Sequence, residues 1–198
     1  LGEGPADLDG TLECTTTAVL ESPTGEYPIT CDGLSSEYYD IEYIDGTLTV
    51  DPAELTVTAD DDARLYGAAN PDFTVSYAGF VLGEGPADLD GTLECTTTAD
   101  TDSPVGDYPI SCDGLTSTNY DIDWVDGTLD VTPAELTITA QDAQRVTGVA
   151  DPSFTVSYDG FVAGDDAADL DGTLECTTTA VTDSPVGDYP ISCDGLTS

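Results

Sequence analysis

The chain has 198 residues and a formal net charge of −39, because 41 acidic residues stand against two basic ones. This charge excludes nucleic acid as a partner and disfavours anionic membranes, since both are bound through Lys and Arg. His and Lys are absent, which removes the residues needed for Ser-His-Asp catalysis, Schiff-base chemistry and His-ligated zinc. The hydrophobic share of 39% is nevertheless too high for a solvated acidic tail, so we expect a folded protein.

A repeat with a period of 81 residues organises the chain. Residues 1–18 recur unchanged at 82–99, and residues 101–117 recur unchanged at 182–198. This period is too long for a solenoid repeat and indicates small domains in an array. Because the sequence contains no Met, we expect it to be a piece of a longer protein with further repeats.

Pro52 and Pro133 mark the expected boundaries between repeats, since proline removes a donor from a strand and suits a short, stiff linker. These boundaries place the C-terminal part of one repeat at 1–53, a complete repeat at 54–134 and the N-terminal part of the next repeat at 135–198. A proline that begins a strand inside one domain is the alternative. The two partial repeats should expose sheet edges and core residues, unless they pair with one another or with other molecules.

Within the complete repeat, six segments alternate apolar and polar residues, which is the pattern of half-buried strands. They are residues 55–58, 73–77, 92–96, 108–112, 120–124 and 128–131. Residues 103–106 (SPVG) predict a turn, and the pair Asp126-Gly127 predicts a tight hairpin between the last two strands. Only residues 85–89 suit a short helical turn, with Pro86 near its start. The predicted fold class is therefore mostly β.

The ordered string of motifs in this repeat resembles a known family. It runs through LTVTADDDARLYGAANPDFTVSYAGF (55–80), GTLECTTTA (91–99), SPVGDYPISCDGL (103–115) and NYDIDWVDGTL (119–129). The string is similar to MBG ("mostly β-grasp") domains, which are tandem modules of large secreted and surface-attached microbial proteins. The resemblance implies tandem β-grasp-like domains with a mixed sheet and at most a short helical segment per repeat. It implies a stalk or adhesive role, with no catalytic residue and no defined ligand site.

Each repeat carries two Cys that lie 17 residues apart, on the two arms of the hairpin that turns at SPVG. Equal arm lengths place these Cys opposite each other across the strands, where a disulfide can form. We therefore predict the disulfides Cys14–Cys31, Cys95–Cys112 and Cys176–Cys193, which indicate a location outside the cytoplasm. Free buried thiols and a metal site are the alternatives, although two Cys without His fall short of a zinc site.

The two basic residues, Arg64 and Arg145, occupy the same position of successive repeats. A guanidinium group can fork onto a carboxylate or onto several backbone carbonyls and so hold a loop against a sheet. We predict a structural cation clamp at each arginine. A contact to an anion or another ligand is the alternative.

Clusters of carboxylates raise the alternative of calcium binding. They are Asp60-Asp61-Asp62, Asp165-Asp166 and the DLDGTLE segments at 7–13, 88–94 and 169–175. A calcium site needs about six to eight oxygen ligands, and the DLDG segments match only part of an EF-hand loop. We expect solvated turns with no metal and no cofactor at these positions. No enzyme is expected either, because a small β repeat offers little cleft for a pair of catalytic carboxyl groups.

The aromatic residues Tyr77, Tyr108, Tyr120 and Trp124 fall on strand positions that face the expected core. Packing in the core is therefore the favoured interpretation, and a platform for stacking sugars is the alternative.

The acidity is typical of proteins that work in concentrated salt, where screening removes the repulsion between neighbouring carboxylates. We therefore predict a halophile's secreted or cell-surface protein, in which this segment is a non-catalytic structural and adhesive repeat module. Its partners would be the neighbouring repeats and a cell-surface glycan or protein. The alternative is a glycan- or calcium-binding module that acts multivalently. No apolar run is long enough to insert into a membrane.

Overall fold

The computed structural model describes residues 4–198, which form short strands and two 3-10 turns. The first expected repeat begins at residue 1, and its first three residues lie outside the described part of the chain. The chain divides into two compact units. The first unit comprises Leu1–Asp60, Phe73–Thr96 and Ile110–Gly127, and the second comprises Asp61–Asp72, Thr97–Pro109 and Thr128–Ser198. Each unit therefore combines a part of the central repeat with one of the partial repeats.

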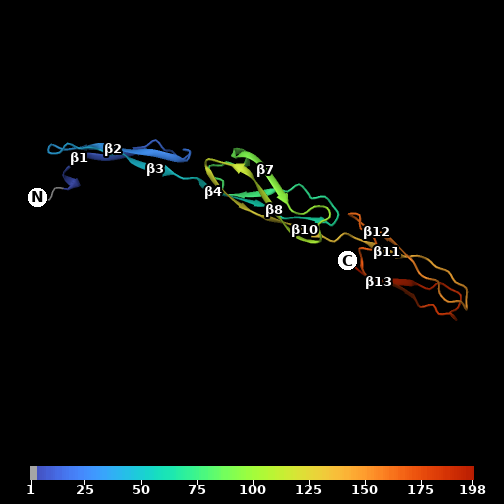
Figure 1. Cartoon of the computed structure of the whole chain (residues 1–198). Coiled ribbons are helices and arrows are strands. Elements are labelled where there is room, and N and C mark those ends of the chain that lie inside the picture. Colours follow the sequence, from blue (N-terminus) through green and yellow to red (C-terminus); the bar gives the residue numbers. More distant parts are fainter. Residues whose placement is uncertain (1–3) are drawn as a thin grey trace. The chain divides into compact units, whose positions relative to one another are not determined.

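The central repeat contains two sheets of short strands, and Figure 1 labels β4, β7, β8 and β10 of them. Its elements are β4 (Ala53–Ala59), β5 (Asp62–Leu65), β6 (Val75–Ala78), η2 (Pro86–Asp88), β7 (Asp90–Thr97), β8 (Gly106–Thr116), β9 (Tyr120–Val125) and β10 (Gly127–Thr132). One sheet has the order β6-β4-β9, and β4 pairs antiparallel with β6 and parallel with β9. The other has the order β5-β10-β8-β7, with β5 and β10 parallel. The predicted class, mostly β with a mixed sheet and a short helical segment, is confirmed.

All six predicted strands are present, and each overlaps one of β4, β6, β7, β8, β9 and β10. Strand β5 was missed because only Arg64 of its four residues, Asp62–Leu65, is buried, so no buried apolar residue marks this strand in the sequence. Residues 85–89 contain the 3-10 turn η2, with Pro86 as its first residue.

The hairpin predicted at Asp126-Gly127 is wrong. Strand β9 belongs to the sheet of β4, and β10 belongs to the sheet of β5 and β8, so the chain crosses between sheets at Gly127. A Cβ atom at Gly127 would lie 2.5 Å from the carbonyl oxygen of Ala59, which shows how closely the crossing chain passes the end of β4. The Asp-Gly pair favours a local reversal, but parallel pairing with distant strands separates β9 from β10.

A pair of glycines recurs in the disulfide hairpin of every repeat, and in the first and last repeats a bulge lies beside it. The pairs are Gly10 with Gly33, Gly91 with Gly114 and Gly172 with Gly195, and all six residues have φ between 92° and 96°. In the central pair, a Cβ atom at Gly91 would lie 2.1 Å from the carbonyl oxygen of Gly114. Only glycine tolerates both this φ and this contact, so the two backbones can approach each other closely here.

The hydrophobic core of the first unit lies on the sheet β6-β4-β9. Leu55 and Val57 of β4 are fully buried, and Tyr120 of β9 is 5% exposed. Tyr77 and Trp124 pack against this cluster, so both lie in the core as expected. The alternation of buried and half-exposed residues along β4 explains why its period-two pattern was readable in the sequence.

The two partial repeats keep the hairpins but leave core positions open. The first contains η1 (Pro5–Asp7), β1 (Asp9–Thr16), β2 (Gly25–Ser35) and β3 (Gly46–Val50), and the last contains β11 (Thr137–Ala140), β12 (Val156–Asp159), β13 (Asp171–Thr178) and β14 (Ile191–Thr197). Leu48 is 37% exposed, whereas its counterpart Leu129 in the central repeat is fully buried. Ile138 is 36% exposed, whereas its counterpart Val57 is fully buried. These apolar side chains are covered only where β4, β9 and β10 occur together.

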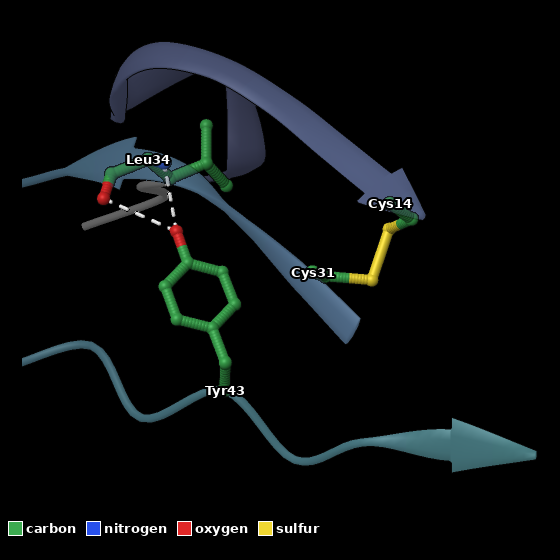
Figure 2. Close-up of a disulfide and its surroundings, with 4 residues drawn as sticks. All are labelled: Cys14, Cys31, Leu34 and Tyr43. Carbon is green, nitrogen blue, oxygen red and sulfur yellow. Dashed lines mark hydrogen bonds between the residues drawn. A yellow bond between two sulfur atoms is a disulfide. The ribbon is translucent and has the colours of Figure 1, made fainter. Parts of the chain in front are cut away.

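Segment 39–44 of the first repeat, the counterpart of β9, is not a strand. It is held instead by the hydroxyl of Tyr43, which accepts a hydrogen bond from the Leu34 amide at 2.7 Å and lies 3.1 Å from the Leu34 carbonyl oxygen. Figure 2 shows this contact beside the disulfide of the same hairpin. Without a partner such as β4, side-chain bonding to β2 replaces the strand pairing.

Replacing Leu129 with Ala should lower the free energy of unfolding of the central repeat by roughly 2–5 kcal/mol, because the side chain is fully buried. The matched variant Leu48→Ala, at the 37% exposed counterpart, should leave this transition almost unchanged. Urea unfolding followed by the fluorescence of Trp124, the single tryptophan of the chain, measures both. Equal losses in the two variants would contradict the assignment of the core.

Candidate functional site

One disulfide joins the two strands of the hairpin in each repeat. The Sγ–Sγ distances are 2.11 Å for Cys14–Cys31, 2.05 Å for Cys95–Cys112 and 2.09 Å for Cys176–Cys193. The strand register pairs Cys14 with Cys31 and Cys176 with Cys193, and Figure 2 shows the first of these bonds. These are the three pairs expected from the spacing of the cysteines. Closing a loop of this size stabilises the fold by about 3 kcal/mol in the chain-entropy model.

Arg64 lies in β5 and is buried, with 6% of its surface exposed. Its Nε donates to Asn70 Oδ1 at 2.7 Å, its Nη1 donates to the Leu65 carbonyl at 3.1 Å, and its Nη2 donates to the Asp100 carbonyl. Asn70 in turn donates from Nδ2 to the Ala99 carbonyl at 2.7 Å. The guanidinium therefore links the loop after β5 to the segment that follows β7, and within residues 4–198 no carboxylate forms an ion pair with it.

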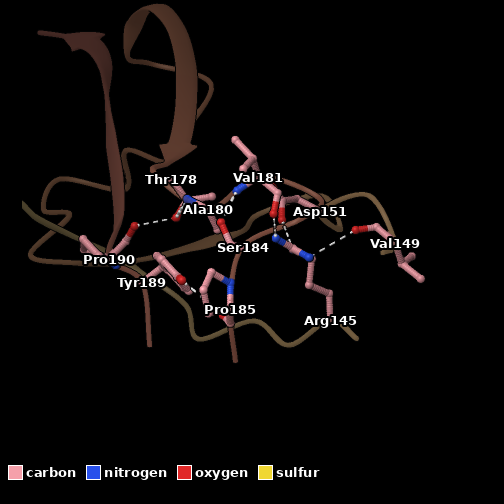
Figure 3. Close-up of polar contacts among 10 residues, drawn as sticks. All are labelled: Arg145, Val149, Asp151, Thr178, Ala180, Val181, Ser184, Pro185, Tyr189 and Pro190. Atoms are coloured by element: carbon pink, nitrogen blue, oxygen red, sulfur yellow. Dashed lines mark hydrogen bonds and ion pairs between the residues drawn. The ribbon is translucent and has the colours of Figure 1, made fainter. Parts of the chain in front are cut away.

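Arg145 repeats this arrangement at the edge of the last repeat, as Figure 3 shows. Its Nε lies 2.5 Å from Asp151 Oδ1, its Nη1 donates to the Val149 carbonyl at 3.3 Å, and its Nη2 donates to the Val181 carbonyl at 2.5 Å. Val181 is the counterpart of Asp100, so both arginines use the same carbonyl position of the repeat. Arg145 is less enclosed than Arg64, because its side chain is 14% exposed beside the 34% exposed Asp151.

The side chain that orients each guanidinium was missed from the sequence. Asn70 and Asp151 occupy the same position of successive repeats, six residues after each arginine. Both bind the Nε atom of their arginine, one as a neutral amide and the other as a carboxylate. The signal was present in the 81-residue period, which places an oxygen-bearing side chain at this position in both copies.

The Asp60-Asp61-Asp62 triplet is engaged by donors of the protein itself. Asp60 accepts hydrogen bonds from Ser76 Oγ at 2.5 Å and from Thr74 Oγ1 at 2.7 Å, and both bonds lower the pKa of this carboxyl, with Ser76 having the larger effect. Asp61 accepts from the Thr128 amide at 2.8 Å, and Asp62 accepts from the Ala63 amide at 2.8 Å.

The DLDGTLE segments also use their first carboxylate locally. Asp88 accepts from the Gly85 amide at 2.8 Å, and Asp7 accepts from the Gly4 amide at 2.7 Å. Asp169 accepts from the Asp166 amide at 2.8 Å. Between residues 4 and 198, no group of three or more His, Cys, Asp or Glu is arranged to hold a metal ion. Through the hydrogen bonds given above, Asp7, Asp88 and Asp169 each cap a short turn.

An open hollow of about 890 Å³ lies in the last repeat, beside Arg145. Residues 142–146 and 188–191 line it, and they are the counterparts of β5 and of the first half of β8. In the central repeat, β10 lies between β5 and β8 in the sheet. The hollow thus corresponds to the place of a strand rather than to a ligand pocket.

The comparison with protein families matches this repeated architecture over almost the whole chain. The model of the MBG domain, YGX type, matches residues 2–49, 55–130 and 136–198. The chain belongs to the MBG domain family. Searches of the curated proteins and of the solved structures find no match. The three matched segments are tandem MBG repeats, and each of them contains one disulfide.

The central MBG repeat contains one Tyr-Gly-X sequence, Tyr66-Gly67-Ala68, directly after β5. The corresponding residues of the last repeat are Thr147-Gly148-Val149.

In the part of the chain that the structure describes, no helix is long and apolar enough to cross a membrane.

Replacing Arg64 with Lys keeps the charge but removes the fork of donors, so the central MBG repeat should lose roughly 1–3 kcal/mol of stability. The matched variant Arg145→Lys should leave the Trp124 unfolding transition unchanged, because that arginine serves the last repeat. Urea unfolding followed by Trp124 fluorescence measures both. An unchanged midpoint in Arg64→Lys would show that the clamp does not stabilise the repeat.

Replacing Asp60 with Asn should lower the stability of the central repeat at neutral pH and have little effect in acid. The pKa of Asp60 in the folded protein lies below its ordinary value of 3.8, so its stabilising contribution is present above that value. The contribution is lost as the pH falls through the lower, folded pKa. Unfolding midpoints of the wild type and the variant, measured at a series of pH values, should therefore converge as the pH falls below 3.8 and through the lower, folded pKa. The exposed Asp72, replaced with Asn, is the control, and a constant difference across the series would contradict the assignment.

Proposed function

We propose that the chain is a non-catalytic structural and adhesive module of a large secreted or cell-surface protein. The observation that carries the proposal is the recurrence of one disulfide-linked hairpin in three tandem MBG repeats. Repetition of one scaffold suits a spacer, in which the number and stiffness of the units matter more than any single surface. The repeat boundaries would lie at 53/54 and 134/135.

The contacts of the arginines and the aspartates support a structural role. The arginines bind mainly backbone carbonyls, which is the role we propose for them as structural clamps. The carboxylates of the Asp triplet and the DLDG turns bind hydroxyl and amide donors of the same repeat. In the proposed module, these charged side chains therefore serve the scaffold itself.

We further propose an extracellular location and adaptation to concentrated salt. Disulfides persist outside the cytoplasm, and all six Cys of the chain are in disulfides. The net charge of −39 opposes compact folding in dilute buffer, because the 41 acidic residues repel one another and only two arginines offset their charge. At 1 M salt the Debye length falls to about 3 Å, compared with about 8 Å at 0.15 M, so most of this repulsion is screened.

Thermal unfolding of the whole chain in NaCl and in CaCl₂ at matched ionic strength tests this proposal. We expect the unfolding temperature to rise with ionic strength and to be equal in the two salts, because screening depends on ionic strength and not on a binding site. Stabilisation by low-millimolar calcium far beyond its ionic strength would overturn the spacer function and favour the calcium-binding alternative. Full stability at about 10 mM NaCl would contradict the adaptation to salt, since the Debye length there is about 30 Å.

A further inference from the structure

The first and central repeats are joined by a short connection and by polar contacts within the first unit. Only Asp51 and Pro52 separate the end of β3 from the start of β4. Thr24, in the hairpin turn of the first repeat, donates from Oγ1 to the Thr118 carbonyl at 2.8 Å. Its amide donates to Asn119 Oδ1 at 3.4 Å.

The central and last repeats meet at different positions, within the second unit. Tyr66, directly after β5, donates from its hydroxyl to Asp165 Oδ1 at 3.4 Å. A Cβ atom at the adjacent Gly67 would lie 2.6 Å from the Cβ and Cγ2 atoms of Val162. The Tyr66-Gly67 loop therefore lies directly against the turn Val162–Asp165 of the following repeat.

The exposure of equivalent residues supports both contacts. Thr24 is half-buried, whereas its counterparts Val105 and Val186 are 53% and 96% exposed. Val162 is half-buried, whereas its counterpart Val81 is 46% exposed. Each residue is covered where a neighbouring repeat touches it.

The contacts between the first and central repeats and those between the central and last repeats involve different positions of the 81-residue period. Mapped onto one pair of neighbouring repeats, they form two parts of one joint. At one end of the central repeat, Arg64 ties the Tyr66-Gly67 loop to Asp100, and the amide of Asp100 donates to Ser103 Oγ of the hairpin turn at 2.8 Å. This turn is the counterpart of the one that carries Thr24. The leading face of a repeat thus contains both the Tyr-Gly loop and the hairpin turn.

The trailing face is tied together in the same way. Tyr120 directly follows Asn119, and its hydroxyl accepts a hydrogen bond from the Val81 amide at 3.1 Å and bonds Glu84 Oε2. The turn Val81–Glu84 is the counterpart of Val162–Asp165, so the two receiving segments lie together on one repeat.

We propose that successive MBG repeats dock through this composite joint. The Tyr-Gly loop of one repeat binds the turn of the next repeat that corresponds to Val162–Asp165, and its hairpin turn binds the loop of the next repeat that corresponds to Asn119. The partner is a second MBG repeat in the same chain. This inference rests on the proposed structural function, and it explains how a tandem array gains stiffness beyond that of its linkers.

Two further features accompany the joint. The turn that receives the Tyr-Gly loop contains a residue other than glycine at positive φ in both described copies, with Leu82 at 57° and Ala163 at 56°. This shared strain holds the turn in one shape. Burial raises the pKa of Tyr66, and the hydrogen bond to Asp165 raises it further.

The matched variants Gly67→Ala and Gly148→Ala in the whole chain test the joint. Both glycines have a similar positive φ, 78° and 83°, so alanine strains the backbone to a similar degree at each. Only at Gly67 does the new Cβ atom meet the following repeat, because nothing lies within 4 Å of the equivalent position at Gly148. The pair therefore separates docking from backbone strain.

Residual dipolar couplings report whether two repeats share one orientation. In the wild type and in Gly148→Ala, we expect one alignment to describe residues 54–134 and 135–198 together. In Gly67→Ala we expect this common alignment to be lost. A common alignment that persists in Gly67→Ala, or separate alignments in the wild type, would overturn the joint.

Trp124 fluorescence verifies that the central repeat of each variant is folded. Should Gly67→Ala fail to fold, Val162→Ala decides, because it removes the Cγ2 methyl group beside Gly67 and adds no backbone strain. Val81→Ala at the exposed counterpart is its control. Loss of the common alignment in Val162→Ala alone supports the joint, and its retention overturns the proposal. The failures of the two proposals can be distinguished. Separate alignments in the wild type would overturn the joint but leave the spacer function, with flexible connections between repeats. A specific calcium response would overturn the spacer function without changing the alignment.

Discussion

The parallel pairing of β4 with β9 closes the hydrophobic core of the repeat, and the other structural features depend on it. It brings Leu55 and Val57 against Tyr120 and Trp124, which lie at the far end of the same repeat. In the partial repeats, which lack one or both of these strands, Leu48 and Ile138 are more than a third exposed. Their counterparts in the central repeat, Leu129 and Val57, are fully buried. A domain of this size buries little apolar surface, so loss of one strand opens most of its core.

The acidity of the chain explains why covalent and arginine links accompany so small a core. Repulsion among 41 acidic residues opposes compaction, and two arginines neutralise only a small part of that charge. The disulfide cross-links the hairpin whatever the ionic strength, and Arg64 is buried and bound by carbonyl and amide oxygens. Aspartates at turns accept hydrogen bonds from nearby amides at exposed positions, so they add charge without disturbing the strands.

Local patterns allowed much of the fold to be predicted. The period-two alternation identified six strands of the central repeat, and Pro86 indicated the 3-10 turn. The hairpin at Gly127 was wrong because a local Asp-Gly signal cannot reveal that β9 and β10 pair with strands of different sheets. Only some residues of the candidate site could be predicted from the sequence. The arginines stood out by composition, but Asn70, which orients Arg64, looked like an ordinary turn residue in a single copy.

The repeat period, the β class and the spacing of the cysteines across a hairpin follow directly from the order of residues, because each depends on positions that are close together in the chain. Which strands share a sheet, and which groups enclose the arginines, is settled instead by the packing of the folded repeat. Ala53 pairs with Tyr120, which lies 67 residues later (120 − 53), and no local pattern specifies a pairing over that distance. The contact of Gly67 with Val162 is of the same kind, since it exists only when one folded repeat meets the next.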